Sequence, residues 1–289
     1  MYDFKTVAEL GLGSLGMAIN MLLMVAIYRA NIPRRWLNLQ LVIPAAVVDF
    51  LGSLVLFLKT ILLINNQLTS PWVCPYLGAS LLILPCLTTV LVSTTALDRY
   101  AIVVHSRGIP HRWGWLCISI TCCSFTATVL VNTIVYDIIH DSTASYCKPI
   151  GSDLLASIIR HYSTAIVFVG LFIITFSYLG IHLHCRKTLA TFHALPDRYL
   201  IIPISYFVCL VPKAIRNIWD LFSEAPPLLL ETEHMGLMLL FLLNPCLVFG
   251  FQSRLRKEVL HIFLPRPTNG QTSTTSESKP SINQSSTPP

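Results

Sequence analysis

Two short stretches of the sequence place ionisable side chains inside long apolar runs. In "STTALDRYAIVV" (93–104), Asp98 and Arg99 are adjacent near the end of such a run, and "LVIPAAVVDF" (41–50) carries Asp49 near the middle of another. A charge in hydrocarbon costs roughly 3 kcal/mol or more unless it is paired, and such residues commonly mark functional sites. These side chains are therefore the first candidates for chemistry, and the runs that hold them must be considered next.

The composition predicts that these runs cross a membrane. Of the 289 residues, 54% are hydrophobic and only 12% are charged, against roughly a quarter charged in globular proteins. A membrane helix needs about 20 mostly apolar residues. The sequence predicts an all-α membrane protein, a seven-transmembrane helix bundle, with spans at about 7–28, 37–64, 72–104, 113–136, 154–183, 199–222 and 234–251.

Basic residues set the expected orientation, because Lys and Arg in short loops favour the cytoplasmic side. They gather after spans one, three, five and seven: Arg29, Arg34, Arg35, Arg107, Arg112, Arg186, Lys187, Arg198, Arg254, Arg256 and Lys257. We therefore expect an extracellular N-terminus, a cytoplasmic C-terminus and a multi-pass plasma-membrane protein. The net charge of +6 is a topology signal and does not indicate nucleic-acid binding.

Two different segments follow the last span. Residues 252–263 place apolar and basic side chains at helical spacing, which predicts a short amphipathic helix on the inner leaflet. It completes a predicted membrane domain over 1–264. Residues 265–289 are rich in Ser, Thr and Pro and are expected to form a disordered cytoplasmic tail. That tail is either a passive solvated end or a phosphorylation platform that recruits partners.

Most of the nine cysteines lie inside the predicted spans, where a thiol behaves as a small apolar group. Cys74, at the start of span three, and Cys147, in the loop after span four, face the oxidising side. A disulfide between them would tie that loop over the mouth of the bundle. The alternative is two unpaired thiols.

Several motifs resemble the rhodopsin-like (class A) G protein-coupled receptors over nearly the whole chain up to about residue 263. "DRY" at 98–100 is similar to the motif at the inner end of that family's third helix, and its separation from Cys74 also matches. Asn20 and Asp49 resemble the family's polar residues of the first and second helices. Tyr178 fits its fifth-helix tyrosine.

The later spans continue the resemblance in the same order. "YFVCLVP" at 206–212 is similar to the sixth-helix F-x-x-C-W-x-P pattern, and "NPCLV" at 244–248 is similar to NPxxY. Pro212 and Pro245 each remove a backbone hydrogen bond and kink their helices, so that the helices can pivot. Leu210 and Val248 depart from the family by replacing its tryptophan and tyrosine.

The resemblance implies a receptor that converts an extracellular small-molecule signal into activation of a heterotrimeric G protein. Asp98 would hold the Arg99 guanidinium at rest. On activation the sixth helix would swing away, Arg99 would extend into a cytoplasmic cavity, and Tyr178 would support that open state. The expected switch residues are Asp98, Arg99, Tyr100, Tyr178, Tyr206, Pro212, Asn244 and Pro245.

Asp49 is expected to lie among polar side chains of other spans. Thr88 on span three and Asn244 on span seven are its expected neighbours, and their oxygens would hold a sodium ion or a water network. The alternative is a structural hydrogen-bonded knot. We expect no other cofactor.

The outer halves of the spans carry cations that define a candidate ligand site. Lys59, Lys213 and Arg216 would converge on a low-dielectric cleft and favour an anion, and His234 would make binding sensitive to pH. The alternative is that these cations reach the outer headgroups or pair with Glu231 and Glu233.

Other function classes remain as alternatives. The sequence has no HExxH, GxSxG or P-loop motif and no cluster of metal ligands, so we do not expect an enzyme. A receptor-like protein without G protein coupling is favoured by Leu210 and Val248. A small-solute transporter or channel with the same topology would need a continuous polar path through the bundle.

Overall fold

A computed structural model describes the backbone of residues 4–29, 37–65, 73–110, 138–141, 146–149, 154–188, 200–219 and 226–251, with separate positions at 112–127 and at 255–260. Within these ranges the side chains at 4–5, 37–40, 74–75, 138–149, 154–160, 188 and 227 are not described. All structural statements below concern the described part of the chain.

Long helices make up most of the described chain. They are α1 (Phe4–Arg29), α2 (Leu37–Ile64), α3 (Val73–His105), α5 (Leu154–Thr188), α6 (Ile201–Trp219) and α7 (Pro227–Phe251). All six are long and apolar enough to cross a membrane, since 20 residues of helix span about 30 Å. The chain thus has the architecture of a helical multi-pass membrane protein, and six of the predicted spans are confirmed as helices.

The predicted fourth span, 113–136, falls mostly outside the described residues. The positions described within it, including Trp115, Ile120 and Thr126, are helical. Helix α7 begins at Pro227, ahead of the predicted residue 234. Proline suits the first turn of a helix because its missing N–H has no partner there in any case.

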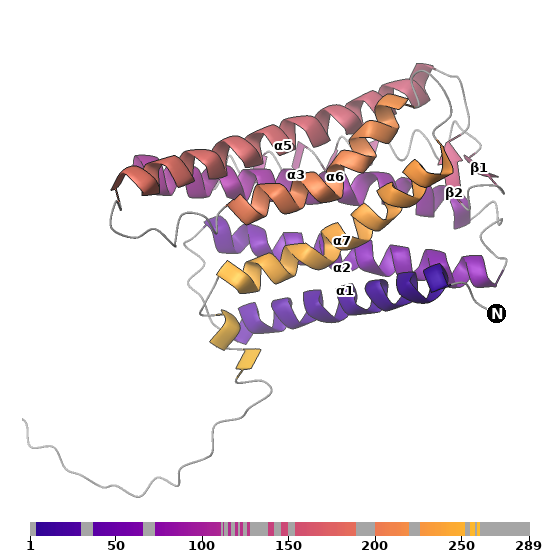
Figure 1. The fold of residues 1–289 in the computed structure, drawn as a ribbon, viewed down its shortest axis with the longest axis horizontal. Helices are drawn as coiled ribbons and strands as arrows, with labels where there is room; N and C mark the ends of the chain where they lie inside the picture. The colour runs from indigo at the N-terminus through magenta and orange to yellow at the C-terminus, as the bar shows by residue number, and fades with distance from the viewer. Residues whose placement is uncertain are drawn as a thin grey trace, which may run out of the picture.

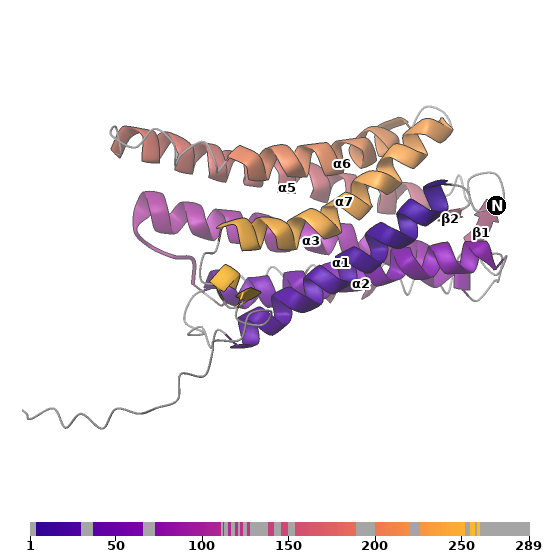
Figure 2. The same cartoon turned by 60° about the horizontal axis from the view of Figure 1, so that its bottom comes forward.

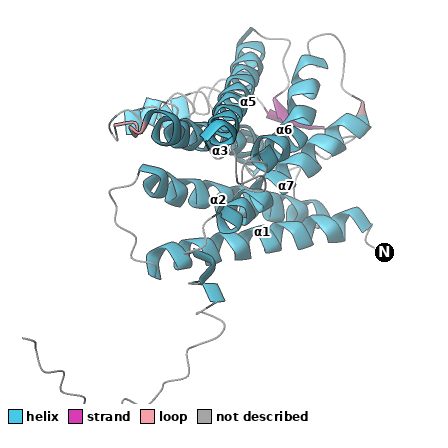
Figure 3. Cartoon of the chain, turned by 60° about the vertical axis from the view of Figure 1, so that its left-hand side comes forward, coloured by secondary structure: helices cyan, strands magenta, loops and turns pink. Residues whose placement is uncertain are grey.

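The helices lie side by side along the long axis of the molecule (Figures 1 and 2). Helix α3 contacts α2 and α5, α6 contacts α5 and α7, and α7 returns to α2. These contacts close a ring of five of the described helices, and α1 packs against α2 and α7. Figure 3, turned by 60° from Figure 1, shows α1, α2 and α7 close together.

Polar and apolar side chains are distributed as expected for a bundle in lipid. Phe172, Val208 and Met21 are among many large apolar residues that are exposed on the outside, whereas Asp49, Thr88 and Asn20 are buried. Water would oppose such an exposed apolar surface, but lipid does not. Buried hydroxyls donate to carbonyls of their own helix, as Thr89 does to Pro85 O at 2.7 Å, which satisfies them without water.

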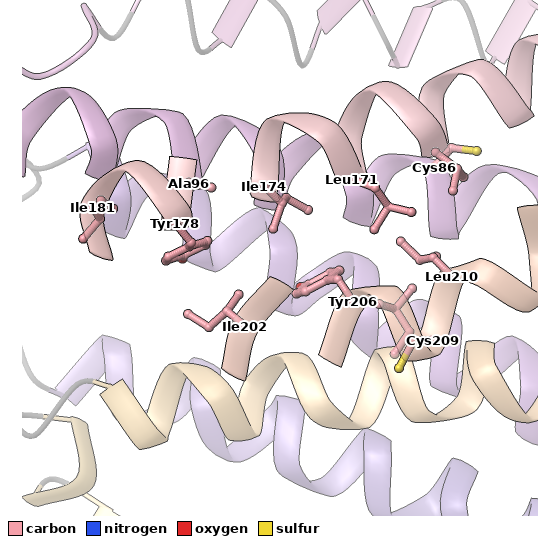
Figure 4. Packing of buried hydrophobic residues seen from close by; sticks show 12 residues of the cluster. Cys86, Ala96, Leu171, Ile174, Tyr178, Ile181, Ile202, Tyr206, Cys209 and Leu210 are labelled. Carbon is pink, nitrogen blue, oxygen red and sulfur yellow. The ribbon is translucent and has the colours of Figure 1, made fainter. Parts of the chain in front are cut away.

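The largest apolar cluster joins α3 and α5 to α6 and α7 (Figure 4). Tyr178 and Ile174 of α5 pack toward Tyr206 and Leu210 of α6, and all four are buried. Leu210, which stands where the resembled family has tryptophan, is fully buried in this cluster. It therefore acts as a core residue at the centre of the α5–α6 contact.

A short two-stranded antiparallel hairpin that was not predicted accompanies the helices. Strands β1 (Ile138–Asp141) and β2 (Tyr146–Pro149) pair with His140 opposite Cys147, and both strands contact α3. Pairing of the two strands satisfies the backbone hydrogen bonds of this segment. The apolar periodicity of the sequence did not predict these strands. Cys74 is in the first turn of α3, but the side chains of Cys74 and Cys147 lie outside the described part, so their disulfide stays a prediction.

The described part of the predicted amphipathic segment is helical at Leu255–Lys257 and at 259–260. Leu255 is fully buried and packs with Leu23, Ile27 and Val42, while Arg256 is exposed. Leu255 thus faces α1 and α2, and the expected position of this segment on the inner leaflet stays a prediction. The expected tail, 265–289, lies outside the described residues.

Close packing of α6 on α7 should make Gly236 intolerant of a side chain. A Cβ at this position would lie 2.5 Å from the Cys209 carbonyl oxygen, which is backbone and cannot rotate away. We expect Gly236→Ala to lower the free energy of unfolding by about 1–3 kcal/mol, measured by thermal or denaturant unfolding in nanodiscs. Gly250→Ala on the same helix is the control, because a Cβ there meets open space; an equal effect of both changes would contradict the packing.

The cysteine pairing is testable by peptide mapping. The backbone places Cys147 on a strand that contacts α3, and Cys74 begins that helix. We expect a Cys74–Cys147 linked peptide in a non-reducing digest and a lower Tm after reduction, because a bridge closing so long a loop adds about 4 kcal/mol. Two alkylatable thiols in the unreduced protein would refute the pairing.

Candidate functional site

The buried Asp49 carboxylate joins four helices through side-chain hydrogen bonds. Asp49 of α2 is 1% exposed. Its Oδ1 accepts from the Thr88 hydroxyl of α3 at 2.8 Å, and its Oδ2 accepts from the Asn244 amide of α7. Tyr206 of α6 donates its hydroxyl to Asn244 Oδ1 at 2.6 Å. The predicted grouping of Asp49, Thr88 and Asn244 is confirmed, and Tyr206 extends it.

The side-chain amide of Asn20 links α1 to α7. The Asn20 side-chain nitrogen donates to Gly16 O at 2.9 Å and to the Phe241 carbonyl of α7 at 3.0 Å. Asn20 is fully buried. Since Phe241 is one turn before Asn244, the α1 contact and the Asp49 network act on the same stretch of α7.

A cavity connects this network to the Arg99 end of the bundle. Its lining includes Asp49 and Asn244 at one end and Arg99, Tyr178 and Phe251 toward the other. Its volume of about 50 Å³ is enough for a few water molecules. Pro245, directly after Asn244, also lines it, so the position where α7 loses a backbone hydrogen bond faces the cavity.

Arg99 reaches across to α5. Its Nη1 donates to the Tyr178 hydroxyl at 3.2 Å, and Tyr178 is 2% exposed. The expected role of Tyr178 in an open state stays a prediction. This bond links α3 and α5 at the Arg99 end of the bundle.

Asp98 contacts the segment that follows α3, and its expected pairing with Arg99 stays a prediction. Its Oδ1 accepts from the Ile109 backbone N–H at 2.8 Å, and the chain turns back at Ser106, whose φ is 54°. Adjacent residues on a helix point in different directions and do not face each other. Asp98 therefore fastens the segment after α3, while Arg99 faces the cavity.

Two further switch residues have different surroundings. Tyr100 packs on His105 and Phe176, with ring centroids 5.5 Å apart in both cases, and lies against Gly180 of α5. It thus serves the α3–α5 contact and does not line the cavity. Pro212 lies inside α6 immediately before the buried Lys213.

The outer cations are paired with carboxylates. Glu233 of α7 lies 2.7 Å from Arg216 Nη1 and 3.7 Å from Lys213 Nζ, and both Lys213 and Glu233 are buried. The alternative of pairing with Glu233 is therefore observed. The positive charges of Lys213 and Arg216 therefore do not form an uncompensated cleft.

The other two candidate ligand residues lie at the same end. His234 Nε2 is 3.5 Å from Glu9 Oε1, and the Thr60 hydroxyl donates to Glu9 Oε2 at 3.1 Å. Lys59 is next to Thr60 on α2 and is 5% exposed. Glu9 and Thr60 were missed from the sequence; Glu9 is an acid within an apolar run, and that is the signal that could have found it.

The donor set at Asp49 fits a hard cation in its chemistry. Three oxygen-bearing groups lie together here: the Asp49 carboxylate, the Thr88 hydroxyl and the Asn244 amide. Hard cations such as Na⁺ prefer oxygen ligands that include a negative charge. Within the described residues no group of three His, Cys, Asp or Glu could hold a metal ion. A transition-metal site is thus not supported there.

Comparison with models of known protein families finds no match, and comparison with curated proteins finds no significant one. The proposals below therefore depend on the geometry and on the sequence motifs.

The hydroxyl of Thr88 should contribute more to stability than that of its neighbour. Thr88→Val keeps the shape but leaves a buried carboxylate oxygen without its donor, so we expect a loss of about 1.5–3 kcal/mol in the free energy of unfolding. Thr89→Val removes a hydrogen bond to a carbonyl of the same helix and leaves no carboxylate without a donor. The decrease in the free energy of unfolding should therefore be smaller for this variant. Equal losses in denaturant titrations of the two variants would contradict the network.

Proposed function

We propose that the chain is a membrane receptor that transmits an extracellular small-molecule signal to a heterotrimeric G protein. The observation that carries the proposal is that two polar groups line one cavity. Asp49, Asn244 and Tyr206 form one of them, and Arg99 with Tyr178 forms the other. Contacts that involve α2, α3, α5, α6 and α7 around one cavity can couple the positions of these helices.

The proposed mechanism is a population shift between two packings of the bundle. A ligand bound at the outer end can favour one packing only by its differential affinity for the two. Pro212 and Pro245 supply flexible points in α6 and α7. When the inner end of α6 moves outward, Arg99 becomes accessible from the cytoplasm, and the G protein tail inserts beside it.

The Arg99–Tyr178 bond gives that mechanism a starting geometry. Arg99 lines the cavity and donates to the Tyr178 hydroxyl. A carbonyl or carboxylate of an inserted partner segment would complete its hydrogen bonding. Sodium held by Asp49, Thr88 and Asn244 would supply a positive charge that stabilises the packing in which the carboxylate is ionised.

The paired outer cations limit the proposed ligand. An anion that binds at Lys213 and Arg216 would have to compete with Glu233, which lies within ion-pair distance of both. Displacement of Glu233 would move α7 relative to α6. An anionic ligand at this position would therefore act directly on the helix that carries Asn244.

Other partners follow from the predicted topology. With the N-terminus outside, the Leu255–Lys257 helix lies on the inner leaflet of the plasma membrane. The Ser/Thr-rich segment 265–289 would then be a cytoplasmic substrate for kinases and, once phosphorylated, a contact for arrestin.

The test is guanine-nucleotide exchange on a panel of purified heterotrimers, with the receptor in nanodiscs. Wild type should accelerate exchange, and Arg99→Ala should lose roughly tenfold to a hundredfold of that acceleration, the equivalent of a charge-assisted hydrogen bond. Tyr178→Phe should lose less. Arg107→Ala is the matched control, because Arg107 is exposed at the same end.

Two outcomes would contradict the proposal. No exchange with any heterotrimer, together with solute flux in liposomes, would support a transporter or channel. Exchange that falls equally in Arg99→Ala and Arg107→Ala would show that cationic charge alone matters and that the cavity position of Arg99 does not.

A further inference from the structure

Two buried carboxylates at the outer end of the bundle have partners of different kinds. Glu233 contacts Lys213 and Arg216, and an arginine guanidinium is permanently charged. Glu9 contacts the Thr60 hydroxyl and the His234 imidazole. Glu233 thus has a fixed counter-charge in Arg216, whereas the charge that His234 presents to Glu9 depends on whether the imidazole carries a proton.

The burial of this second pair makes that dependence strong. Glu9 and His234 are each about 4% exposed. A buried carboxylate is costly unless a counter-charge accompanies it. An imidazolium with its Nε2 at 3.5 Å from Glu9 Oε1 removes that cost, and histidine ordinarily changes charge near pH 6.5.

The charges around His234 come from each helix packed against α7. Helix α1 contributes Glu9, and α2 contributes the buried Lys59 beside Thr60. Helix α6 contributes Lys213 and Arg216, both held by Glu233.

On α7 itself, Glu231 is exposed and Glu233 is turned toward α6. Because neighbouring helical residues point in different directions, Glu233 and His234 serve different contacts. Glu9 Oε1 lies within ion-pair distance of His234 Nε2.

We propose that Glu9 and His234 form a proton-binding site that ties α1 to α7 when the extracellular side is acidic. A proton moves from a buffer acid to the imidazole and gives an imidazolium, and no other bond breaks. The same two helices meet again at the Asn20–Phe241 bond next to Asn244. A change at the outer end is thereby passed to the helix that carries the Asp49 network. The consequence for signalling rests on the proposed G protein coupling.

The first test is the Tm of the protein in nanodiscs between about pH 8 and about pH 6. The ion pair exists when His234 is protonated, so wild type should gain Tm as the pH falls and lose it as the pH rises. His234→Gln, Glu9→Gln and the double variant should all lose this gain. His161→Gln, at an exposed position near the start of α5, should keep it. A wild-type Tm that does not change, or an unchanged gain in His234→Gln, would overturn the proposal.

The second test keeps both charged residues and so does not depend on the folding of a variant. Spin labels at the exposed positions Val7 and Leu228 report the separation of the outer ends of α1 and α7. The distance distribution should be narrower at about pH 6 than at about pH 8. Identical distributions would overturn the proposal.

Nucleotide exchange separates this inference from the proposed function. The assay uses proteoliposomes in which the pH on the G protein side is fixed and the pH on the opposite side is varied. If the exchange rate of wild type depends on the varied pH and that of His234→Gln does not, the result supports the proton site and its signalling role. No exchange at any pH, with the Tm gain intact, supports the proton site and contradicts G protein coupling. Exchange without any pH response in activity or Tm overturns the proton site alone.

Discussion

The Asp49 carboxylate, buried in the middle of apolar helices, imposes the main constraint on this structure. Such a group must receive hydrogen bonds from the polar groups around it, because lipid cannot supply them. Thr88, Asn244 and, through Asn244, Tyr206 meet that need from three other helices. The relative rotation of α2, α3, α6 and α7 is therefore fixed by polar contacts, whereas apolar packing against lipid-facing neighbours would tolerate several rotations.

Helix α7 links this constraint to both ends of the bundle. Near its start it carries Glu233 and His234, which contact α6 and α1 respectively. Near its inner end it carries Asn244 and Pro245, which line the same cavity as Arg99. Four residues of α7 thus connect the charged groups near its start to the buried polar network and the cavity near its other end. This arrangement lets a small displacement at one end change hydrogen bonds at the other.

Much of the inner site could be predicted from the sequence, because polar residues in apolar spans have few possible partners. Asp49, Thr88 and Asn244 were grouped correctly on that basis. The direction of Asp98 could not be predicted, since it depends on the turn after α3 that presents the Ile109 N–H. The Glu9–His234 contact could not be predicted either, because it joins helices that are far apart in the sequence and depends on the rotation of each helix about its own axis. The β1–β2 hairpin was missed because paired strands in a short loop leave little periodicity to detect.

Movement of α6 away from α3 when a G protein binds is the event on which the account of function depends. Spin labels at the exposed residues Val103 on α3 and Ile204 on α6, on a background without accessible cysteines, measure the separation of the two inner ends. The account predicts that this distance increases when nucleotide-free G protein is added and returns when guanine nucleotide releases it. A distance that stays the same in both conditions, with the heterotrimer bound, would contradict it.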